Sequence, residues 1–187
     1  MHPPGGKAEK KVHYSGRHLR FCTVGHWEYV ERTRAASAVV VAALTPAGEV
    51  VFVEQYRPPV GANVLELPAG LVGDGPEGSA EDPVEAARRE LLEESGFTAA
   101  HWEFATKGPI SPGLSTESIH LLVAGELKRA NDGGGVHGEE EITVHLVRLE
   151  QAHPWLEERR AGGLLVDPKV YAGLFFLLAR QGGRRGG

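Results

Sequence analysis

The sequence predicts a mixed α/β (α+β) fold, and three observations lead to this expectation. Runs of β-branched and other apolar residues recur along most of the chain, separated by turns rich in Gly and Pro. A single charged helix, which begins after Asp82, interrupts these runs. Two helical patterns close the C-terminal part. With 187 residues and 41% hydrophobic content, the chain can build one sizeable core with a small appendage.

The expected elements begin with a small N-terminal antiparallel β region over 12–25 and 27–34. Residues 37–57 contain two apolar runs around a Pro-Ala-Gly turn, and this pattern predicts a β-hairpin. In the last helix, Asp167 supplies the N-cap and Pro168 the first position. The remaining expected elements are strands over 63–68, 101–106, 119–127 and 142–149, a Pro/Gly loop over 108–118, a glycine-rich loop over 128–141, and helices over 150–162 and 167–180.

The charged helix has clear signals at both ends. Asp82 is a good N-cap, and Pro83 suits the first helical position. Glu85 stands where a capping box places its carboxylate. Gly96 is a natural C-terminal stop, because glycine adopts the left-handed conformation without strain. The sequence therefore predicts a helix over 83–95.

Three glutamates of this helix converge along one edge. At about 100° per residue, Glu90, Glu93 and Glu94 fall together beside the apolar stripe that contains Leu91. Like charges so placed lower stability unless something positive lies among them. One interpretation is an ordinary solvated face, with Arg89 and Glu93 forming an i,i+4 pair. The other is a divalent metal site, because carboxylate oxygens suit Mg²⁺ or Mn²⁺.

Composition argues against several classes of function. The formal net charge of -5 does not suggest nucleic-acid binding through a basic surface. Cys22 is the only cysteine, so no disulfide framework is expected. No apolar run approaches the roughly 18 residues of a membrane span, and residues 1–11 lack the core of a signal peptide. We expect a cytoplasmic protein without a membrane or nucleic-acid partner, with disordered ends over 1–6 and 182–187.

The residues in and around the charged helix also match a known signature. Gly75, Glu81, Arg89, Glu90, Leu91, Glu93, Glu94, Gly96 and Phe97 fit the pattern G-x5-E-x7-R-E-U-x-E-E-x-G-U, in which U is a bulky apolar residue. This segment resembles the box of the Nudix family. The resemblance implies a Nudix fold, in which a mixed β-sheet is sandwiched between helices and the box forms a loop-helix-loop. It also implies hydrolysis of a nucleoside diphosphate linked to another moiety, with divalent metal held on the pyrophosphate.

The glycine of the box has two candidates. In the members that this chain most resembles, the glycine follows Pro-Ala, which here makes it Gly70 rather than Gly75. We favour Gly70, which implies an insertion between it and Glu81. Such an insertion lengthens the loop before the helix at little cost in closure entropy and leaves the glutamates in place.

Further segments resemble the ADP-ribose and ADP-sugar pyrophosphatases of this family, namely 26–33, 55–71, 110–120 and 164–173. Pro112 lies where that group has its marker proline. The resemblance implies hydrolysis of ADP-ribose or a related ADP-sugar to AMP and a sugar phosphate, ribose 5-phosphate in the first case. It also implies a homodimer, in which residues 1–34 pack on the partner and complete its adenine pocket. The Nudix domain would then span 35–181.

The same resemblance implies a metal site and its ligands. Ala69 would offer its backbone carbonyl to Mg²⁺, for which Mn²⁺ could substitute. Glu90 and Glu94 would be the main carboxylate ligands. Glu93 would be shared between the metal and the catalytic set, to which Arg89 also belongs.

Substrate contacts and the catalytic base are implied in the same way. Glu140, in the glycine-rich loop, would position or deprotonate the attacking water, with Glu139 and Glu141 as alternatives. Trp27 would stack on adenine, and Arg57 would contact the phosphates. The full set of implied substrate-binding residues is Trp27, Glu28, Arg32, Arg57, Gly113 and Glu117.

Alternatives stay open for several of these assignments. Trp27 could be a core or interface aromatic residue, Arg57 a turn residue, and the run 139–141 a solvated loop. The same fold could act on another substrate, such as GDP-mannose or flavin adenine dinucleotide. A non-catalytic nucleotide-sugar sensor is an alternative of another class, although the complete box argues against it.

Overall fold

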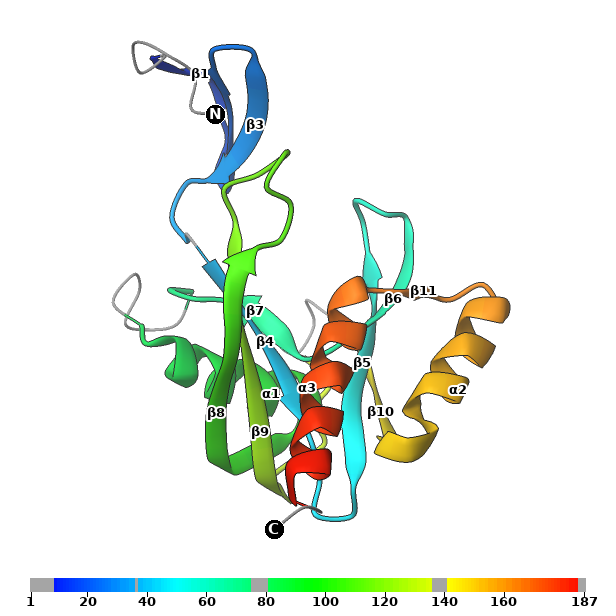
Figure 1. Ribbon diagram of the computed structural model, residues 1–187. Coiled ribbons are helices and arrows are strands. Elements are labelled where there is room, and N and C mark those ends of the chain that lie inside the picture. Colours follow the sequence, from blue (N-terminus) through cyan, green and yellow to red (C-terminus); the bar gives the residue numbers. More distant parts are fainter. Residues whose placement is uncertain (1–8, 36, 75–80, 136–140, 185–187) are drawn as a thin grey trace.

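The computed structural model describes residues 9–35, 37–74, 81–135 and 141–184, with only the backbone described for 182–184. Strands in this part form three sheets (Figure 1). The first contains β1 (Lys10–Ser15), β2 (Leu19–Val24) and β3 (Trp27–Arg32). The second has the order β7 (Ala69–Leu71), β4 (Ser37–Ala43), β9 (Ser118–Arg129) and β8 (Phe97–Pro109). The third has the order β10 (Ile142–Arg148), β5 (Glu49–Arg57), β6 (Ala62–Glu66) and β11 (Leu165–Val166). The helices are α1 (Pro83–Ser95), α2 (Leu149–Ala161) and α3 (Pro168–Arg184).

Strand β4 lies at the centre of the core and is covered on both faces. Val40 and Ala42 belong to a buried cluster that includes side chains of α2 and α3. Val39 and Val41 belong to a second cluster, which includes side chains of α1. Successive strand residues point to opposite faces, so a continuous apolar run is what a strand covered on both sides requires. Sheets lie between helices, which confirms the expected fold class (Figure 1).

The hairpin expected over 37–57 is wrong in its pairing. Both strands and the turn between them form, but β4 and β5 lie in different sheets. A single bridge, Leu44 to Val50, joins them. Strand β4 pairs with β9 in parallel from Ser37 to Ala43, and β5 pairs with β10 along Glu49 to Gln55. These long ladders replace the local pairing that the turn would otherwise favour.

Helix α1 has the ends that the sequence predicts. The side chain of Asp82 accepts a hydrogen bond from the N–H of Val84 at 2.8 Å. Gly96 ends the helix with a φ of 74°, and its N–H donates to the last turn. Glu85 pairs with Arg88 at 3.2 Å.

The expected N-terminal antiparallel β region forms, but the segment 12–25 divides into β1 and β2, so the sheet has three strands. It projects from the body of the molecule (Figure 1). All of β1 is exposed, including the side chains of Val12 and Tyr14. The sheet joins the body through the loop before β9, where the N–H of Val30 donates to the carbonyl of Leu114 at 2.9 Å. Among the described elements, the strands of this sheet contact one another much more than they contact any other helix or strand.

Several further elements differ from the expectations in extent or in presence, among them β7, which was not expected. Strand β8 runs to Pro109, well beyond the short strand expected over 101–106. The short strand β11 was not expected; it pairs in parallel with β6 and leads into α3. The backbone of α3 continues to Arg184, past the expected helix end at 180. None of the helices in the described ranges combines the length and apolar character needed to cross a membrane.

Candidate active site

A cleft of about 380 Å³ brings residues of the second and third sheets together with the glutamate face of α1. Its walls include Val40 of β4, Ala69 of β7 and Ile119 of β9. Its charged lining residues are Arg32, Arg57, Glu66, Asp74, Glu90, Glu94, Glu117 and Lys169. Acidic and basic groups from segments far apart in the sequence therefore meet in one space.

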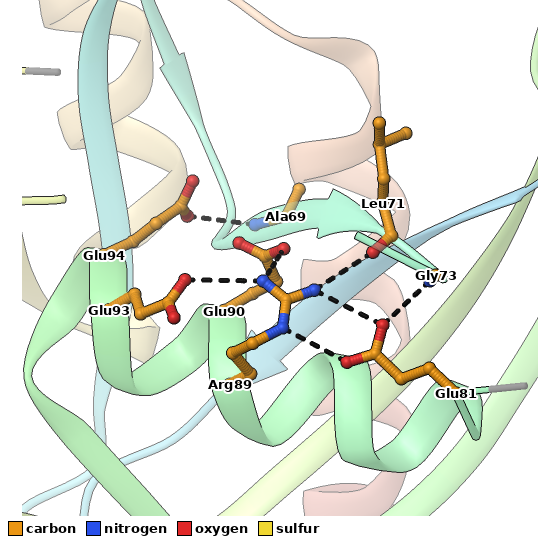
Figure 2. Close-up of polar contacts among 8 residues, drawn as sticks. All are labelled: Ala69, Leu71, Gly73, Glu81, Arg89, Glu90, Glu93 and Glu94. Carbon is orange, nitrogen blue, oxygen red and sulfur yellow. Dashed lines mark hydrogen bonds and ion pairs between the residues drawn. The ribbon is translucent and has the colours of Figure 1, made fainter. Parts of the chain in front are cut away.

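Glu90 and Glu94 lie one helical turn apart on α1 and reach this cleft from buried positions, where 9% and 6% of each whole residue is exposed. The N–H of Ala69 donates to the carboxylate of Glu94 at 3.0 Å (Figure 2). Gly70 lies directly against Glu90, because a Cβ at position 70 would come within 1.9 Å of the Glu90 carboxyl carbon. Any side chain at position 70 would displace the carboxylate of Glu90. This close contact explains why the Pro-Ala-Gly segment has glycine at this position.

Arg89 lies among the glutamates and ties them together (Figure 2). Its Nε donates to Glu81 at 3.1 Å. Its Nη1 donates to Glu90 at 2.7 Å and to Glu93 at 3.3 Å. Its Nη2 donates to the carbonyl of Leu71 at 3.1 Å. Burial lowers the pKa of Arg89, but the hydrogen bond to Glu81 and the charge of Glu90 outweigh it, so the pKa lies above its ordinary value. Arg89 thus supplies the positive charge that the glutamate cluster needs.

Glu81 ties the end of β7 to the start of α1 and is not among the residues that line the cleft. Its buried carboxylate accepts a hydrogen bond from the N–H of Gly73 at 2.8 Å as well as from Arg89. Gly75, the other candidate for the box glycine, falls in the segment 75–80, which lies outside the described residues.

The side chains of α1 suit a hard divalent cation. Proteins commonly bind Mg²⁺ through one or two carboxylates, with substrate phosphates and waters as the other ligands. Glu90 and Glu94 offer two such carboxylates to one cleft. Glu93 is less buried, with 39% of its side chain exposed, and it is paired with Arg89. In the parts of the chain that the structure describes, no three His, Cys, Asp or Glu side chains are grouped so that they could hold a metal ion. Backbone carbonyls, water and substrate phosphates are further groups that suit such an ion.

Cations and their carboxylate partners, together with Asp74, form the rest of the charged lining. Arg57 Nε donates to Glu66 at 2.6 Å. Arg32 Nε donates to Glu117 at 2.5 Å, which places two implied substrate-binding residues in direct contact. Lys169, at the start of α3, is paired with Asp167 and also lines the cleft.

Sequence reasoning missed Glu66 and Lys169 as residues of the cleft. A signal for Glu66 was present, since it is the one ionisable residue in the apolar strand 62–66, and a buried charge requires a partner. Lys169 follows the N-cap Asp167 and the first helical residue Pro168. Lys169 lines the cleft because α3 begins beside it. The position of this helix relative to the sheets cannot be read from the local sequence.

Three of the implied substrate-binding residues lie apart from the cleft within one chain. Trp27 and Gly113 line a separate pocket of about 260 Å³ between the N-terminal sheet and the loop before β9. The side chain of Trp27 is an exposed one. Glu28 is exposed on β3. The fold of a single chain therefore does not place these three residues in the cleft that Glu90 lines.

The candidate catalytic base is only partly covered by the structure. Glu140 and Glu139 lie outside the described residues. Glu141, the third member of the run, is exposed and directly precedes β10. Its main chain is therefore placed at the start of the strand that pairs with β5.

The proteins that this chain resembles in sequence include one activator and two pyrophosphatases. The methanol dehydrogenase activator of Bacillus methanolicus is 35% identical over 151 residues, which cover 81% of this chain and 77% of the activator. The ADP-ribose pyrophosphatase of Bacillus subtilis (strain 168) is 34% identical over 129 residues, 69% of this chain and 67% of the relative. The ADP-sugar pyrophosphatase of Mus musculus is 38% identical over 162 residues, 78% of this chain and 71% of the relative.

The fold and the family follow from two further matches. A crystal structure of an ADP compounds hydrolase superposes with a TM-score of 0.73 over 96% of this chain and 95% of that one, at 19% identity, so the two share a fold. Residues 33–166, most of the chain, match the NUDIX domain family. Members of this family generally depend on a divalent metal ion, which agrees with the two buried carboxylates that α1 presents to the cleft. The chain belongs to the Nudix family and is a Nudix hydrolase.

Proposed function

We propose that this chain hydrolyses the diphosphate of ADP-ribose or a related ADP-sugar, giving AMP and a sugar phosphate such as ribose 5-phosphate. The observation that carries the proposal is the meeting of two buried carboxylates, Glu90 and Glu94, with Arg32 and Arg57 in one cleft. Carboxylates suit a divalent metal ion, and guanidinium groups suit phosphate oxygens. The relatives named as ADP-ribose and ADP-sugar pyrophosphatases favour a substrate with an adenine nucleotide.

Glu90 and Glu94 would hold Mg²⁺, with Mn²⁺ as a substitute, and the carbonyl of Ala69 would add a backbone ligand. When bound, such an ion neutralises the charge of the diphosphate and acidifies a water molecule. Arg89 contacts Glu90 and Glu93 directly, so its part in catalysis would be to position their carboxylates. Glu93 would complete the acidic set from its more exposed place at the edge of the helix.

The arginines of the cleft would bind the phosphates and the nucleotide. Arg57 would contact phosphate oxygens, and Glu66 would fix its guanidinium, which it contacts at 2.6 Å. A guanidinium that is already held in place loses little freedom when it binds a phosphate. Arg32 and Glu117, joined at 2.5 Å, would act in the same way towards the nucleotide.

Glu140 stays our proposal for the residue that positions or deprotonates the attacking water, with Glu139 and Glu141 as alternatives. Loss of a general base lowers the rate by about 10²–10⁴-fold. We therefore expect Glu140→Gln to lower kcat for ADP-ribose by this amount while KM changes little. Glu139→Gln and Glu141→Gln are the matched controls. Should one of these lose the activity while Glu140→Gln keeps it, that residue is the base.

We also propose that the chain acts as a homodimer through residues 1–34. Several large apolar side chains of the N-terminal sheet are exposed, among them Tyr14, Phe21 and Trp27. In a dimer, Trp27, Glu28 and Gly113 could complete the adenine pocket of the partner. Deletion through Arg34 should then give a monomer by light scattering, with poor affinity for substrate. A truncated protein that remains dimeric would contradict this assignment.

The activity itself is tested by product analysis over a panel of substrates. ADP-ribose, other ADP-sugars, GDP-mannose and flavin adenine dinucleotide would be incubated with Mg²⁺ and, separately, with Mn²⁺. We expect AMP and ribose 5-phosphate from ADP-ribose, at the highest kcat/KM of the panel. A higher kcat/KM for GDP-mannose or flavin adenine dinucleotide would identify that compound as the preferred substrate. Binding without any turnover would favour a sensor.

The cytoplasmic location stays a prediction.

A further inference from the structure

The base of the glycine-rich loop is docked on the C-terminal end of α1. We call Gly133, Gly134 and Gly135 the glycine neck. The N–H of Gly134 donates to the carbonyl of Glu94 at 2.9 Å, and the N–H of Gly135 donates to the carbonyl of Glu93 at 3.0 Å. The neck therefore binds the main chain of two of the glutamates whose side chains form the acidic edge of the helix.

The neck and the end of the helix touch so closely that neither accepts a side chain. A Cβ on Gly133 would lie 2.4 Å from the carbonyl carbon of Ser95. A Cβ on Gly96 would lie 2.3 Å from the carbonyl oxygen of Asn131. Both glycines also have positive φ, 67° at Gly133 and 74° at Gly96. The Asn131 side chain holds the arrangement by accepting a hydrogen bond from the N–H of Gly133 at 2.8 Å.

This contact supplies what the last turn of α1 lacks. The final carbonyls of a helix have no partner within the helix, and helix ends fray unless other groups satisfy them. The carbonyls of Glu93 and Glu94 belong to this last turn, because α1 ends at Ser95. Glu94 nevertheless has a buried carboxylate held at a set place in the cleft. The neck fixes the backbone from which that carboxylate extends.

The neck also sets where β10 begins. The carbonyl of Gly134 accepts a hydrogen bond from the N–H of Ile142 at 3.4 Å. Glu141 directly precedes Ile142. Gly134 thus joins α1 on one side and the start of β10 on the other, so two hydrogen bonds link the main chain of Glu94 to that of Ile142.

We propose that the glycine neck is a positioning element of the metal site, which holds the last turn of α1 so that Glu93 and Glu94 present their carboxylates in a fixed geometry. This inference rests on the proposed function for the identity of the site. Loss of groups that orient metal ligands typically lowers metal affinity or activity about 10- to 100-fold. The neck acts through the backbone of the ligands, so disturbing it should weaken metal binding by a similar factor.

Gly134→Ala tests the proposal, and Gly163→Ala is its matched control. Gly134 has a φ of 103° and Gly163 a φ of 93°, and a Cβ would meet no atom closer than 3.8 Å at either position. The two alanines therefore impose similar backbone strain, but Gly163 lies in the turn after α2, and its N–H binds Arg160. Direct binding of Mn²⁺, measured from the electron paramagnetic resonance signal of the free ion, should weaken about 10-fold or more in Gly134→Ala. Gly163→Ala should bind Mn²⁺ as the wild type does.

Two further measurements keep the proposal open to refutation if Gly134→Ala folds poorly. Asn131→Ala removes the side chain that holds Gly133 and leaves every glycine in place, and it should weaken Mn²⁺ binding in the same direction. Hydrogen exchange in the wild type should show slow amide exchange at Gly134 and Gly135. Unchanged Mn²⁺ affinity in both neck variants, or an equal loss in Gly163→Ala, would overturn the proposal.

The outcomes separate this inference from the proposed function. A wild-type protein that binds Mn²⁺ but does not hydrolyse ADP-ribose would refute the proposed substrate, and the comparison of Mn²⁺ affinities would still decide the role of the neck. A wild-type protein that hydrolyses ADP-ribose, together with neck variants of normal Mn²⁺ affinity, would refute the neck alone.

Discussion

Two regions of the molecule carry clusters of ion pairs, and they differ in their surroundings. On α1, Arg89 pairs with Glu81 and Glu90, and the three side chains are 21%, 6% and 12% exposed. On the N-terminal sheet, Lys10 and Arg20 pair with Glu31, with 44%, 40% and 14% of these side chains exposed. Removing one partner of a buried pair leaves an uncompensated charge, whereas exposed pairs contribute little. Similar residue types should therefore behave very differently in the two regions.

The two regions also differ in their candidate roles. Helix α1 packs on the core through its apolar side chains, and Glu90 of its ion-pair cluster lines the cleft, so this carboxylate is held for binding. The N-terminal sheet exposes apolar residues such as Tyr14 and Trp27, so its candidate role is contact with another molecule. The following substitutions would sharpen or break this division, and they are taken from the largest expected effect to the smallest.

Arg89→Ala should destabilise the protein most, because it leaves the buried carboxylates of Glu81 and Glu90 without their shared cation. The expected loss in the free energy of unfolding is about 3 kcal/mol, at the lower end for a broken buried pair, because Arg89 is partly exposed. Denaturant unfolding at pH 7 measures it. Arg88→Ala is the control on the same helix. Arg88 pairs with the exposed Glu85 and lies over the ring of Trp102, and loss of these more exposed contacts should change stability by about 1 kcal/mol. Equal losses of unfolding free energy in Arg89→Ala and Arg88→Ala would show that burial does not make the Arg89 ion pairs more important for stability.

Glu94→Gln should keep the fold and lose most of the activity. Gln can still accept the hydrogen bond from Ala69, but it lacks the charge of a metal ligand. Metal stabilisation of the transition state is worth several kcal/mol, so kcat/KM should fall by about 100-fold or more. Steady-state kinetics with ADP-ribose and Mg²⁺ measure the loss. Glu85→Gln, an exposed glutamate in the first turn of the same helix, should retain normal turnover.

Trp27→Ala tests whether the N-terminal sheet takes part in binding. If Trp27 stacks on adenine, the lost contact is worth roughly 1–3 kcal/mol by comparison with base stacking on proteins. KM should then rise while kcat changes little, because the contact is the same in the ground and transition states. Tyr14→Ala, another exposed aromatic residue of this sheet, is the matched control. A normal KM in Trp27→Ala would leave Trp27 as an interface or surface residue.

Glu31→Gln should have the smallest effect, and that effect should depend on pH. The hydrogen bond from Lys10 lowers the pKa of Glu31 and outweighs burial, which raises it; the positive charges of Lys10 and Arg20 also lower it. A lowered carboxyl pKa stabilises the folded protein above the unfolded value, ordinarily 4.5, and this contribution disappears as the pH falls through the folded pKa. The small difference in Tm between wild type and variant should be present at pH 7 and vanish at low pH. A difference that grows on acidification would contradict this.

The sequence predicted the local features of α1 well. The caps Asp82 and Gly96 set the ends of α1, and the helical period decides which glutamates share its acidic edge. These signals are local, because a cap and a helical period involve residues only a few positions apart. Predictions of which strands pair were less accurate, because the partners can lie far apart in the sequence. The turn between β4 and β5 suggested a hairpin, but β9 and β10 offered both strands longer ladders.

The placement of the implied substrate residues shows the same limit. Arg32, Arg57 and Glu117 line the cleft with Glu90 and Glu94, whereas Trp27 and Gly113 line another pocket. A motif identifies residues one at a time, but it does not say which side of the molecule each one faces. Glu66 went unnoticed because its role follows from its contact with Arg57, nine residues away on a neighbouring strand.

The sequence by itself determined the class of fold, the limits of α1 and the grouping of its glutamates, because helical period and capping are properties of neighbouring residues. Only the tertiary structure decided that Gly70 packs on Glu90, that Arg89 serves several carboxylates, and that the glycine neck binds the end of the helix. Those contacts join segments that the chain brings together only when the sheets and α1 pack on a common core. The physical reason is that burial and steric contact depend on distance in space, which no spacing in the sequence encodes for residues on separate elements.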